Sequence, residues 1–221
     1  LGDVYKRQDA AYFEHEGQKY FSNQIALNWD ELLSLSQYLT SNEDAPVRND
    51  RSITKYGIYV TNWFGFGWSV GGDCLEWVED ASLPRGGKYV FTLFDDTPNY
   101  SVKEGETVTV NGTEYAEGEV VEYNDKGALT DADKAKCREL PSQLDAMEYF
   151  VALSATHGVS PRPDVTSSNS SHGISSSGQA AMFAAGVNSM GILRSTIYPE
   201  DHPAGFDWDV APWPKAEHGI A

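Results

Sequence analysis

The sequence contains few of the features that would assign a chain to a class at once. Two cysteines, Cys74 and Cys137, occur in 221 residues, too few for a disulfide framework or a cysteine-based metal site. They could form one bridge in an oxidising compartment or remain two buried thiols, and we expect thiols. No stretch approaches the roughly 20 apolar residues that a membrane-spanning helix needs.

Basic residues are also scarce, because 16 Lys and Arg face 33 Asp and Glu, for a formal net charge of −17. Nucleic acids and anionic membranes attract clustered Lys and Arg, so we expect neither as a partner. The 40% hydrophobic and 12% aromatic content is enough for a packed core. Aromatic rings fill cores or stack on flat ligands. The composition therefore favours an acidic globular protein that handles a neutral ligand.

The motifs of common catalytic sites are missing. The sequence has no G-x-S-x-G, H-E-x-x-H, P-loop or C-x-x-C pattern, and its five histidines are scattered. A glycoside hydrolase needs two carboxylates placed about 5–5.5 or 6.5–9.5 Å apart, and 33 acidic residues make candidate pairs inevitable, so counting them decides nothing. We therefore expect a binding protein without a cofactor.

Acidic residues gather between positions 104 and 125. A calcium loop is one interpretation, but the regular ligand spacing and the turn glycine of an EF-hand are missing. We expect no metal site and a solvated face, formed by Glu104, Glu106, Glu114, Glu117, Glu119, Glu122 and Asp125.

The first half of the chain alternates helix and strand patterns. Residues 29–39 are predicted to form a helix with Asn28 as its N-cap and acids in its first turn. Residues 56–60 and 89–93 read as strands. Residues 107–115 read as a hairpin that turns at Asn111-Gly112, and residues 119–123 as an extension of that small sheet.

The second half continues the alternation. Pro141 opens a well-buried helix that ends near His157-Gly158, with glycine as its C-terminal cap. The Ser-rich residues 160–177 are a loop, residues 177–183 a helical stretch, and residues 206–211 a strand. The predicted class is therefore α/β with an inserted β-hairpin.

Three stretches, in this order, resemble the family 1 extracellular solute-binding proteins, the group that includes maltose-binding protein. They are residues 27–33 (LNWDELL), 178–186 (GQAAMFAAG) and 206–214 (FDWDVAPWP), and residues 141–161 add the helix that ends H-G-V-x-P. Two positions depart from the family pattern, because Gln179 replaces its lysine and Asn188 its stacking tryptophan.

The resemblance implies a type II periplasmic-binding-protein-like lobe, one of two lobes that hold a ligand between them. It implies a sugar or oligosaccharide as ligand, the permease subunits of an ABC transporter as partner, and a monomer outside the cytoplasm, in the periplasm or on the cell surface as a lipoprotein. The chain starts with Leu1 and has no export signal. We expect a fragment that contains most of the C-terminal lobe.

The expected domain organisation follows from the same resemblance. Residues 1–24 lie near the inter-lobe hinge, and the first eight, LGDVYKRQ, could be a foreign junction. Residues 25–216 form the partial lobe, with an acidic insertion at about 89–137. Residues 217–221 begin the crossover to the other lobe.

A candidate ligand site follows the strand at 56–60. A sugar cleft needs aromatic platforms beside hydrogen-bonding groups, and α/β sheets place ligand sites after their strands. The candidate residues there are Asn62, Trp63, Phe64 and Phe66, although core positions are the alternative for these aromatics. Gly186 and Asn188 are added by the resemblance, and for Asn188 the alternative is an ordinary turn residue.

The sequence is compatible with two alternative functions. A non-catalytic carbohydrate-binding module would use the same aromatics but is usually an all-β sandwich, which the two predicted helices at 29–39 and 142–156 oppose. A binding protein for another polar solute would share the fold and differ only in its ligand.

Overall fold

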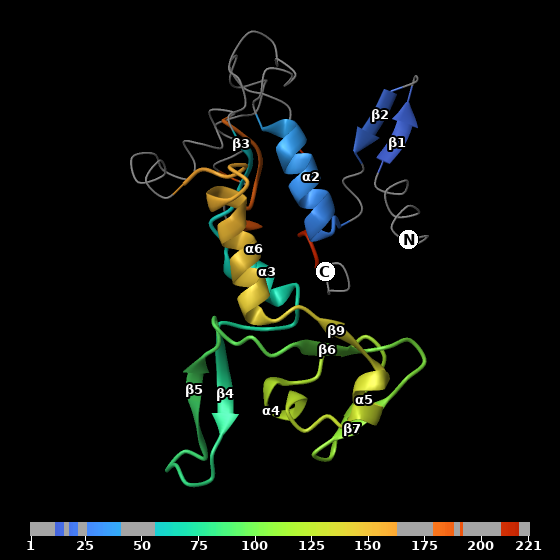
Figure 1. The fold of residues 1–221 in the computed structure, drawn as a ribbon, viewed down its shortest axis with the longest axis vertical. Helices are drawn as coiled ribbons and strands as arrows, with labels where there is room; N and C mark the ends of the chain where they lie inside the picture. The colour runs from blue at the N-terminus through green and yellow to red at the C-terminus, as the bar shows by residue number, and fades with distance from the viewer. Residues whose placement is uncertain are drawn as a thin grey trace. The chain divides into compact units, whose positions relative to one another are not determined.

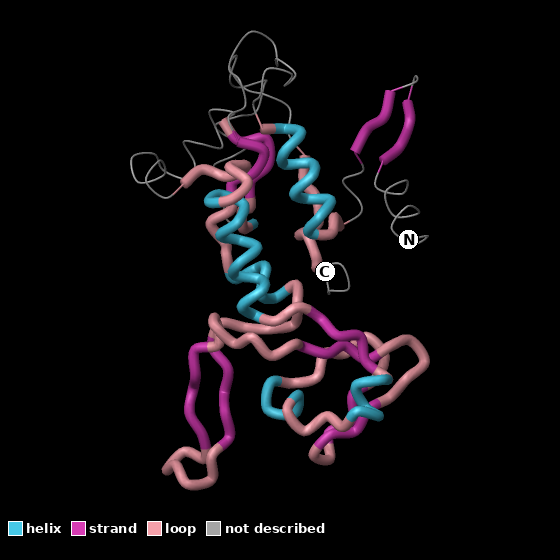
Figure 2. Tube along the Cα trace, in the orientation of Figure 1, coloured by secondary structure: helices cyan, strands magenta, loops and turns pink. Residues whose placement is uncertain are grey.

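The computed structural model describes residues 12–15, 18–21, 26–40, 56–162, 179–187, 191 and 209–216. The chain divides into two compact units, residues 1–62 with 151–213, and residues 63–150 with 214–221. The described part is a mixture of helices and small sheets, each of two strands (Figures 1 and 2). Within it, no helix has the length and apolar character needed to cross a membrane.

The first unit contains the predicted N-terminal helix, α2 (Trp29–Leu39). The side chain of Asn28 accepts from the backbone N–H of Glu31, and the Glu31 carboxylate accepts from the backbone N–H of Asn28, both at 2.8 Å. This reciprocal capping box confirms the predicted N-cap and satisfies two donors that the helix itself leaves free. A short hairpin, β1 (Tyr12–His15) with β2 (Gln18–Phe21), precedes the helix.

Helix α2 packs closely on strand β3 (Tyr56–Tyr59), the strand predicted at 56–60. A Cβ at Gly57 would overlap the backbone carbonyl of Ser36, so only glycine permits this approach. The Thr40 hydroxyl donates to the Ser36 carbonyl at 2.7 Å and accepts from the Gly57 N–H at 2.9 Å, which ties the end of the helix to the strand.

Strand β3 pairs in parallel with β10 (Ala180–Phe183), with Tyr56 opposite Ala180 and Tyr59 opposite Phe183. The helix predicted for residues 177–183 is therefore wrong in its described part. The run Ala180-Ala-Met-Phe183 is short and apolar, and such a run suits a buried strand as well as a helix. Its backbone continues the pairing on both sides, because Tyr56 N–H donates to Gln179 and Ala184 N–H to Tyr59.

The strand predicted at 206–211 is not formed where the structure describes it, since residues 209–211 have no regular secondary structure. Residues 206–208 lie outside the described residues, as do residues 1–8, most of the loop 160–177, and 217–221.

The second unit contains a two-stranded ribbon, β4 (Leu75–Glu79) with β5 (Gly87–Phe91), where β5 covers most of the strand predicted at 89–93. Asn124 covers the outer edge of β4. Its amide donates to the Trp77 carbonyl at 2.6 Å, and its carbonyl accepts from the Glu79 N–H at 3.4 Å. The edge of β5 that faces away from β4 pairs with no strand among the described residues.

A small module with its own core follows. Strands β6 (Asn99–Val102) and β9 (Cys137–Leu140) pair antiparallel, and between them lie β7 (Val108–Val110), β8 (Thr113–Tyr115), α4 (Tyr123–Lys126) and α5 (Asp131–Ala135). The core of this module is one buried cluster from the four strands and the connecting segments, formed by Tyr100, Val102, Val108, Val110, Tyr115, Val121, Leu129 and Cys137. The predicted hairpin is thus part of a module that begins and ends on a paired strand.

The predicted hairpin turn is confirmed. Val110 lies opposite Thr113, and the two turn residues have positive φ, 49° at Asn111 and 90° at Gly112, as a type I′ turn requires. The predicted extension at 119–123 differs. Val120 forms an isolated bridge to Ser101 of β6, and Tyr123 already belongs to α4.

The helix predicted after Pro141 is confirmed as α6 (Gln143–Ala155). Ser142 caps it, because its hydroxyl accepts from the Asp145 backbone N–H at 3.1 Å. The Asp145 carboxylate in turn accepts from the backbone N–H of Ser142 at 2.8 Å. Gly158 has φ 63°, and the Val159 N–H donates back to Leu153, as expected for a glycine-terminated helix. Cys74 and Cys137 are both free thiols.

Candidate functional site

Two of the predicted site segments meet at the same end of one sheet. Because β3 and β10 run parallel in register, their carboxyl ends point the same way. Asn62 follows β3 and Gly186 follows β10, so both lie beyond the carboxyl ends of neighbouring strands. Ligand sites of α/β sheets lie in this position. Asn62 is half-buried, while Thr61 and Gly186 are exposed.

The aromatic part of the predicted site belongs to the second unit and forms a short helix, α3 (Phe64–Trp68). The rings of Trp63 and Phe64 contact edge to face with centroids 5.7 Å apart, and the Phe64 ring also contacts that of Trp68 at 4.8 Å. Trp63 and Phe64 are half-buried, and Trp68 is 53% exposed. These three rings form an aromatic cluster that reaches the surface of the unit.

Phe66 does not belong to this cluster. Its side chain is fully buried and packs against Tyr149 and Phe150 of α6, with ring centroids 5.3 and 6.2 Å away. Phe66 is therefore a core residue, as the alternative interpretation of these aromatics had it, and not the predicted ligand contact. The helix explains why Phe66 is separated from the other two rings. Phe64 and Trp68 are four residues apart and lie on one face, and Phe66 points to the other face.

Trp68 is a surface ring that the predicted site omitted. The signal in the sequence was its spacing of four from Phe64, which places both rings together only if the segment is helical. The glycines at 65 and 67 argued against a helix. In the structure both are buried, and Gly67 lies against the side chain of Gln143, so close packing explains glycine at this position. Asn188 lies outside the described residues.

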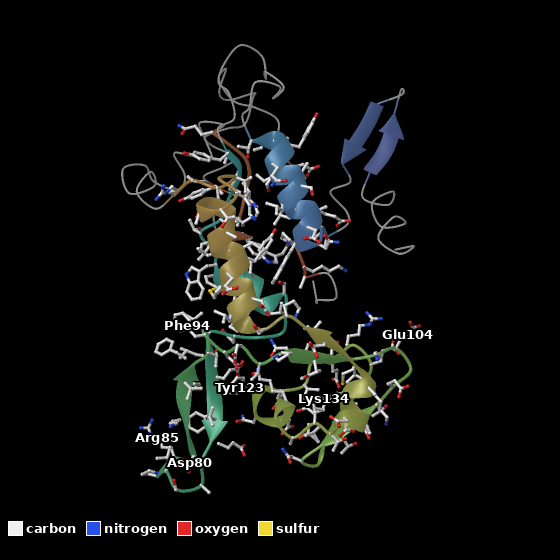
Figure 3. All side chains as sticks on the ribbon, viewed as in Figure 1. Asp80, Arg85, Phe94, Glu104, Tyr123 and Lys134 are labelled. Atoms are coloured by element: carbon white, nitrogen blue, oxygen red, sulfur yellow. The ribbon has the colours of Figure 1, made fainter. Side chains whose placement is uncertain are left out.

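A second aromatic surface lies on the β4–β5 ribbon. Leu75 faces Phe91 and Trp77 faces Tyr89 across the two strands, so these four side chains share one face of the ribbon. Tyr89 is 69% exposed and Phe91 80% exposed, and the Trp77 and Tyr89 rings contact edge to face at 5.1 Å. Phe94, which follows β5, also projects into solvent (Figure 3).

A buried polar cluster lies in the same unit. The Lys126 ammonium is 2.6 Å from the Asp95 carboxylate, and it also donates to the Thr97 carbonyl and to the Asn99 side chain, both at 3.3 Å. The ammonium lies 4.7 Å from the ring centre of Tyr123 on α4. Burial alone would raise the pKa of Asp95, but the hydrogen bonds from Lys126 and Thr97 lower it below its ordinary value. Because the ammonium is fully engaged, the cluster is best explained as structural.

Asp125 is buried, so it does not belong to the predicted solvated face of carboxylates. It is 8% exposed and accepts hydrogen bonds from the Tyr115 hydroxyl at 2.6 Å and the Asn111 amide at 2.9 Å. Burial, and then the hydrogen bond to Asp125, raise the pKa of Tyr115 to about 12. The remaining predicted members of that face are exposed. Among the described residues, no group of His, Cys, Asp and Glu side chains could hold a metal ion.

Comparisons of the chain with protein-family models, with curated proteins and with solved structures find no match.

Proposed function

We propose that this chain is a lobe of an extracytoplasmic solute-binding protein. It captures a neutral sugar or oligosaccharide and delivers it to the membrane permease of an ABC importer, as a monomer and without catalysis. The lobe is of the α/β, type II periplasmic-binding kind.

The observation that carries the proposal is the parallel pairing of β3 with β10. It aligns Asn62 and Gly186, which come from motifs more than a hundred residues apart, beyond the same ends of two strands. Parallel pairing of distant strands is typical of α/β architecture, and the residues after such strands are where ligands bind.

The chemistry of the candidate residues supports a sugar as the ligand. Pyranose rings present flat C–H faces surrounded by hydroxyl groups, which suit aromatic platforms and amide side chains. In the second unit, Trp63 and the α3 residues Phe64 and Trp68 supply ring faces. In the first unit, Asn62 supplies an amide. The net charge of −17 disfavours acidic sugars.

The test is ligand-detected NMR of the chain against neutral and acidic oligosaccharides, because this method detects affinities near 1 mM, about 4 kcal/mol. We expect weak binding, since one lobe leaves a face of the ligand in water. Trp63→Ala and Trp68→Ala should each weaken binding by about 1–3 kcal/mol, the range for a lost stacking platform. The absence of signal from every neutral saccharide would contradict the proposal.

The exposed rings of the β4–β5 ribbon favour a second candidate, a non-catalytic carbohydrate-binding surface. Tyr89 and Phe91 present their side chains on one face. The variants Tyr89→Ala and Phe91→Ala separate the candidates. If they abolish binding while Trp68→Ala leaves it unchanged, the ribbon holds the sugar and the lobe proposal loses its site.

A further inference from the structure

The turn between β7 and β8 presents the dipeptide Asn111-Gly112 at the surface of the second unit. Both residues are exposed, and space around the Cβ position of Gly112 is open, with no atom within 4 Å. The turn lies between the paired residues Val110 and Thr113. In an Asn-Gly sequence the backbone nitrogen of glycine is unshielded by a side chain, so it can reach the side-chain carbonyl carbon of the asparagine.

The side chain of Asn111 is held by the buried carboxylate of Asp125. Its amide nitrogen donates to one carboxylate oxygen at 2.9 Å, while the Tyr115 hydroxyl donates to the other at 2.6 Å. Asp125 is 8% exposed, so these two donors compensate much of the loss of water around its charge.

We propose that Asn111 is a site of spontaneous deamidation whose rate is controlled by its hydrogen bond to Asp125. Hydroxide removes the proton of the Gly112 nitrogen, which attacks the Asn111 Cγ atom and forms a new C–N bond. The bond from Cγ to the amide nitrogen breaks, and that nitrogen leaves as ammonia after taking a proton from water. A second water molecule opens the cyclic imide to aspartate or isoaspartate.

The hydrogen bond slows the reaction because Cγ must turn toward the Gly112 nitrogen before attack. While the amide is anchored to Asp125, the side chain is not free to fold over its own backbone. Hydrogen bonds to charged groups are among the stronger ones in proteins. We therefore expect release of the anchor to accelerate the reaction about tenfold, which corresponds to about 1.4 kcal/mol.

Both products of the reaction destabilise the turn. Aspartate at position 111 replaces a donor by a second carboxylate facing Asp125, and like charges at this distance repel. Isoaspartate also lengthens the main chain of a two-residue turn, which disturbs the register of Val110 with Thr113. Val110 and Tyr115 are buried in the core of the module, so the modification loosens that core.

The experiment incubates the full chain under mildly alkaline, native conditions. Peptide mapping by mass spectrometry follows the amide-to-acid mass shift at position 111 together with isoaspartate. The same chain in urea gives the rate without the anchor. We expect conversion of the folded chain to be slower than in urea. Asp125→Leu, which has a similar shape but no acceptor, should react about tenfold faster than the native sequence, and Tyr115→Phe should react at the native rate. Tyr115→Phe is the matched control, because it removes the other donor to Asp125 and leaves the Asn111 contact.

Circular dichroism establishes that each variant is folded. If Asp125→Leu unfolds, Asp125→Glu displaces the carboxylate by one methylene and should react at an intermediate rate. Asn111→Gly keeps positive φ and should show no conversion at this position. An unmodified position 111 in folded chains, under conditions in which the urea sample converts fully, overturns the site. If the native sequence and folded Asp125→Leu react at the same rate, Asp125 does not control the reaction.

Discussion

Gly67 and Gln143 lie so close that a Cβ at position 67 would stand 2.6 Å from the side-chain carbonyl oxygen of Gln143. The amide of Gln143 is also confined by Gly72, where a Cβ would be 2.5 Å from the same oxygen. Gln143 is 3% exposed, and neither polar atom of its side chain has a hydrogen-bond partner among the described residues.

Gln143→Met should therefore stabilise the protein. It preserves the length of the side chain and removes a buried unpaired amide, whose desolvation costs about 1–3 kcal/mol. Urea denaturation should show a gain of this order. Gln143→Glu, which has the same shape but a charge, should destabilise. A loss of stability in Gln143→Met would mean that the amide is hydrogen-bonded in solution.

Truncation of Phe66 should destabilise the protein much more than truncation of Trp68. Phe66→Ala leaves a cavity beside Tyr149 and should cost about 3–5 kcal/mol of unfolding free energy. Trp68 is 53% exposed, so Trp68→Ala should cost about 1 kcal/mol or less. Urea denaturation of the two variants measures the difference. Equal losses would place Trp68 in the core and remove it from the proposed site.

The ion pair of Lys126 with Asp95 should contribute to stability as a unit. Its side chains are 8% and 14% exposed, and removing one partner of a buried pair leaves the other uncompensated, at about 3–5 kcal/mol. Lys126→Met and Asp95→Asn should therefore each destabilise strongly. Lys88→Met, an exposed lysine on β5, is the control and should change little. A Lys126→Met variant as stable as this control would show that the pair is hydrated in solution.

Asp95 should make the protein sensitive to acid. Its folded-state pKa lies below its ordinary value, so its contribution to stability is complete above the unfolded pKa of about 3.9. That contribution is lost as the pH falls through the lower folded value. The unfolding free energy of Asp95→Asn should consequently change less over this acidic window than that of the native sequence. Parallel pH profiles would contradict the assignment.

The ionisation of Glu76 should instead destabilise the protein as the pH rises. Burial, and then the charge of Asp73, raise its pKa above the ordinary value. The folded state therefore binds more protons than the unfolded state between the two pKa values, and stability falls as the pH rises through that window. Glu76→Gln should raise the melting temperature at neutral pH and lose this advantage in acid. An advantage that is constant with pH would point to packing.

The sequence predicted correctly the caps and turns that depend on only a few neighbouring residues. The capping group of Asn28, the turn at Asn111-Gly112 and the glycine at 158 each determine a backbone conformation through their own side chain or through its absence. These features were confirmed because no distant contact competes with them.

Elements that depend on distant partners were harder to predict. The run Ala180–Phe183 is a strand because β3 lies beside it, and its own apolar pattern suits either helix or strand. Phe64–Trp68 is a helix despite two glycines because Gly67 lies against Gln143, 76 positions later in the chain. The burial of Phe66 also depends on distant residues. Its ring points inward because it packs against Tyr149 and Phe150, and the sequence near Phe66 does not show this contact.

Asn124 gives the β4–β5 ribbon two unlike edges, and this limits what can polymerise on it. An added strand should pair more readily along β5, because the Asn124 amide already contacts the Trp77 carbonyl and the Glu79 N–H on the other side. Two copies joined along β5 would carry β4 and its Asn124 contacts at each outer margin, which disfavours the addition of a further strand. The difference between the two edges therefore favours a closed pair over an open fibre built from this ribbon.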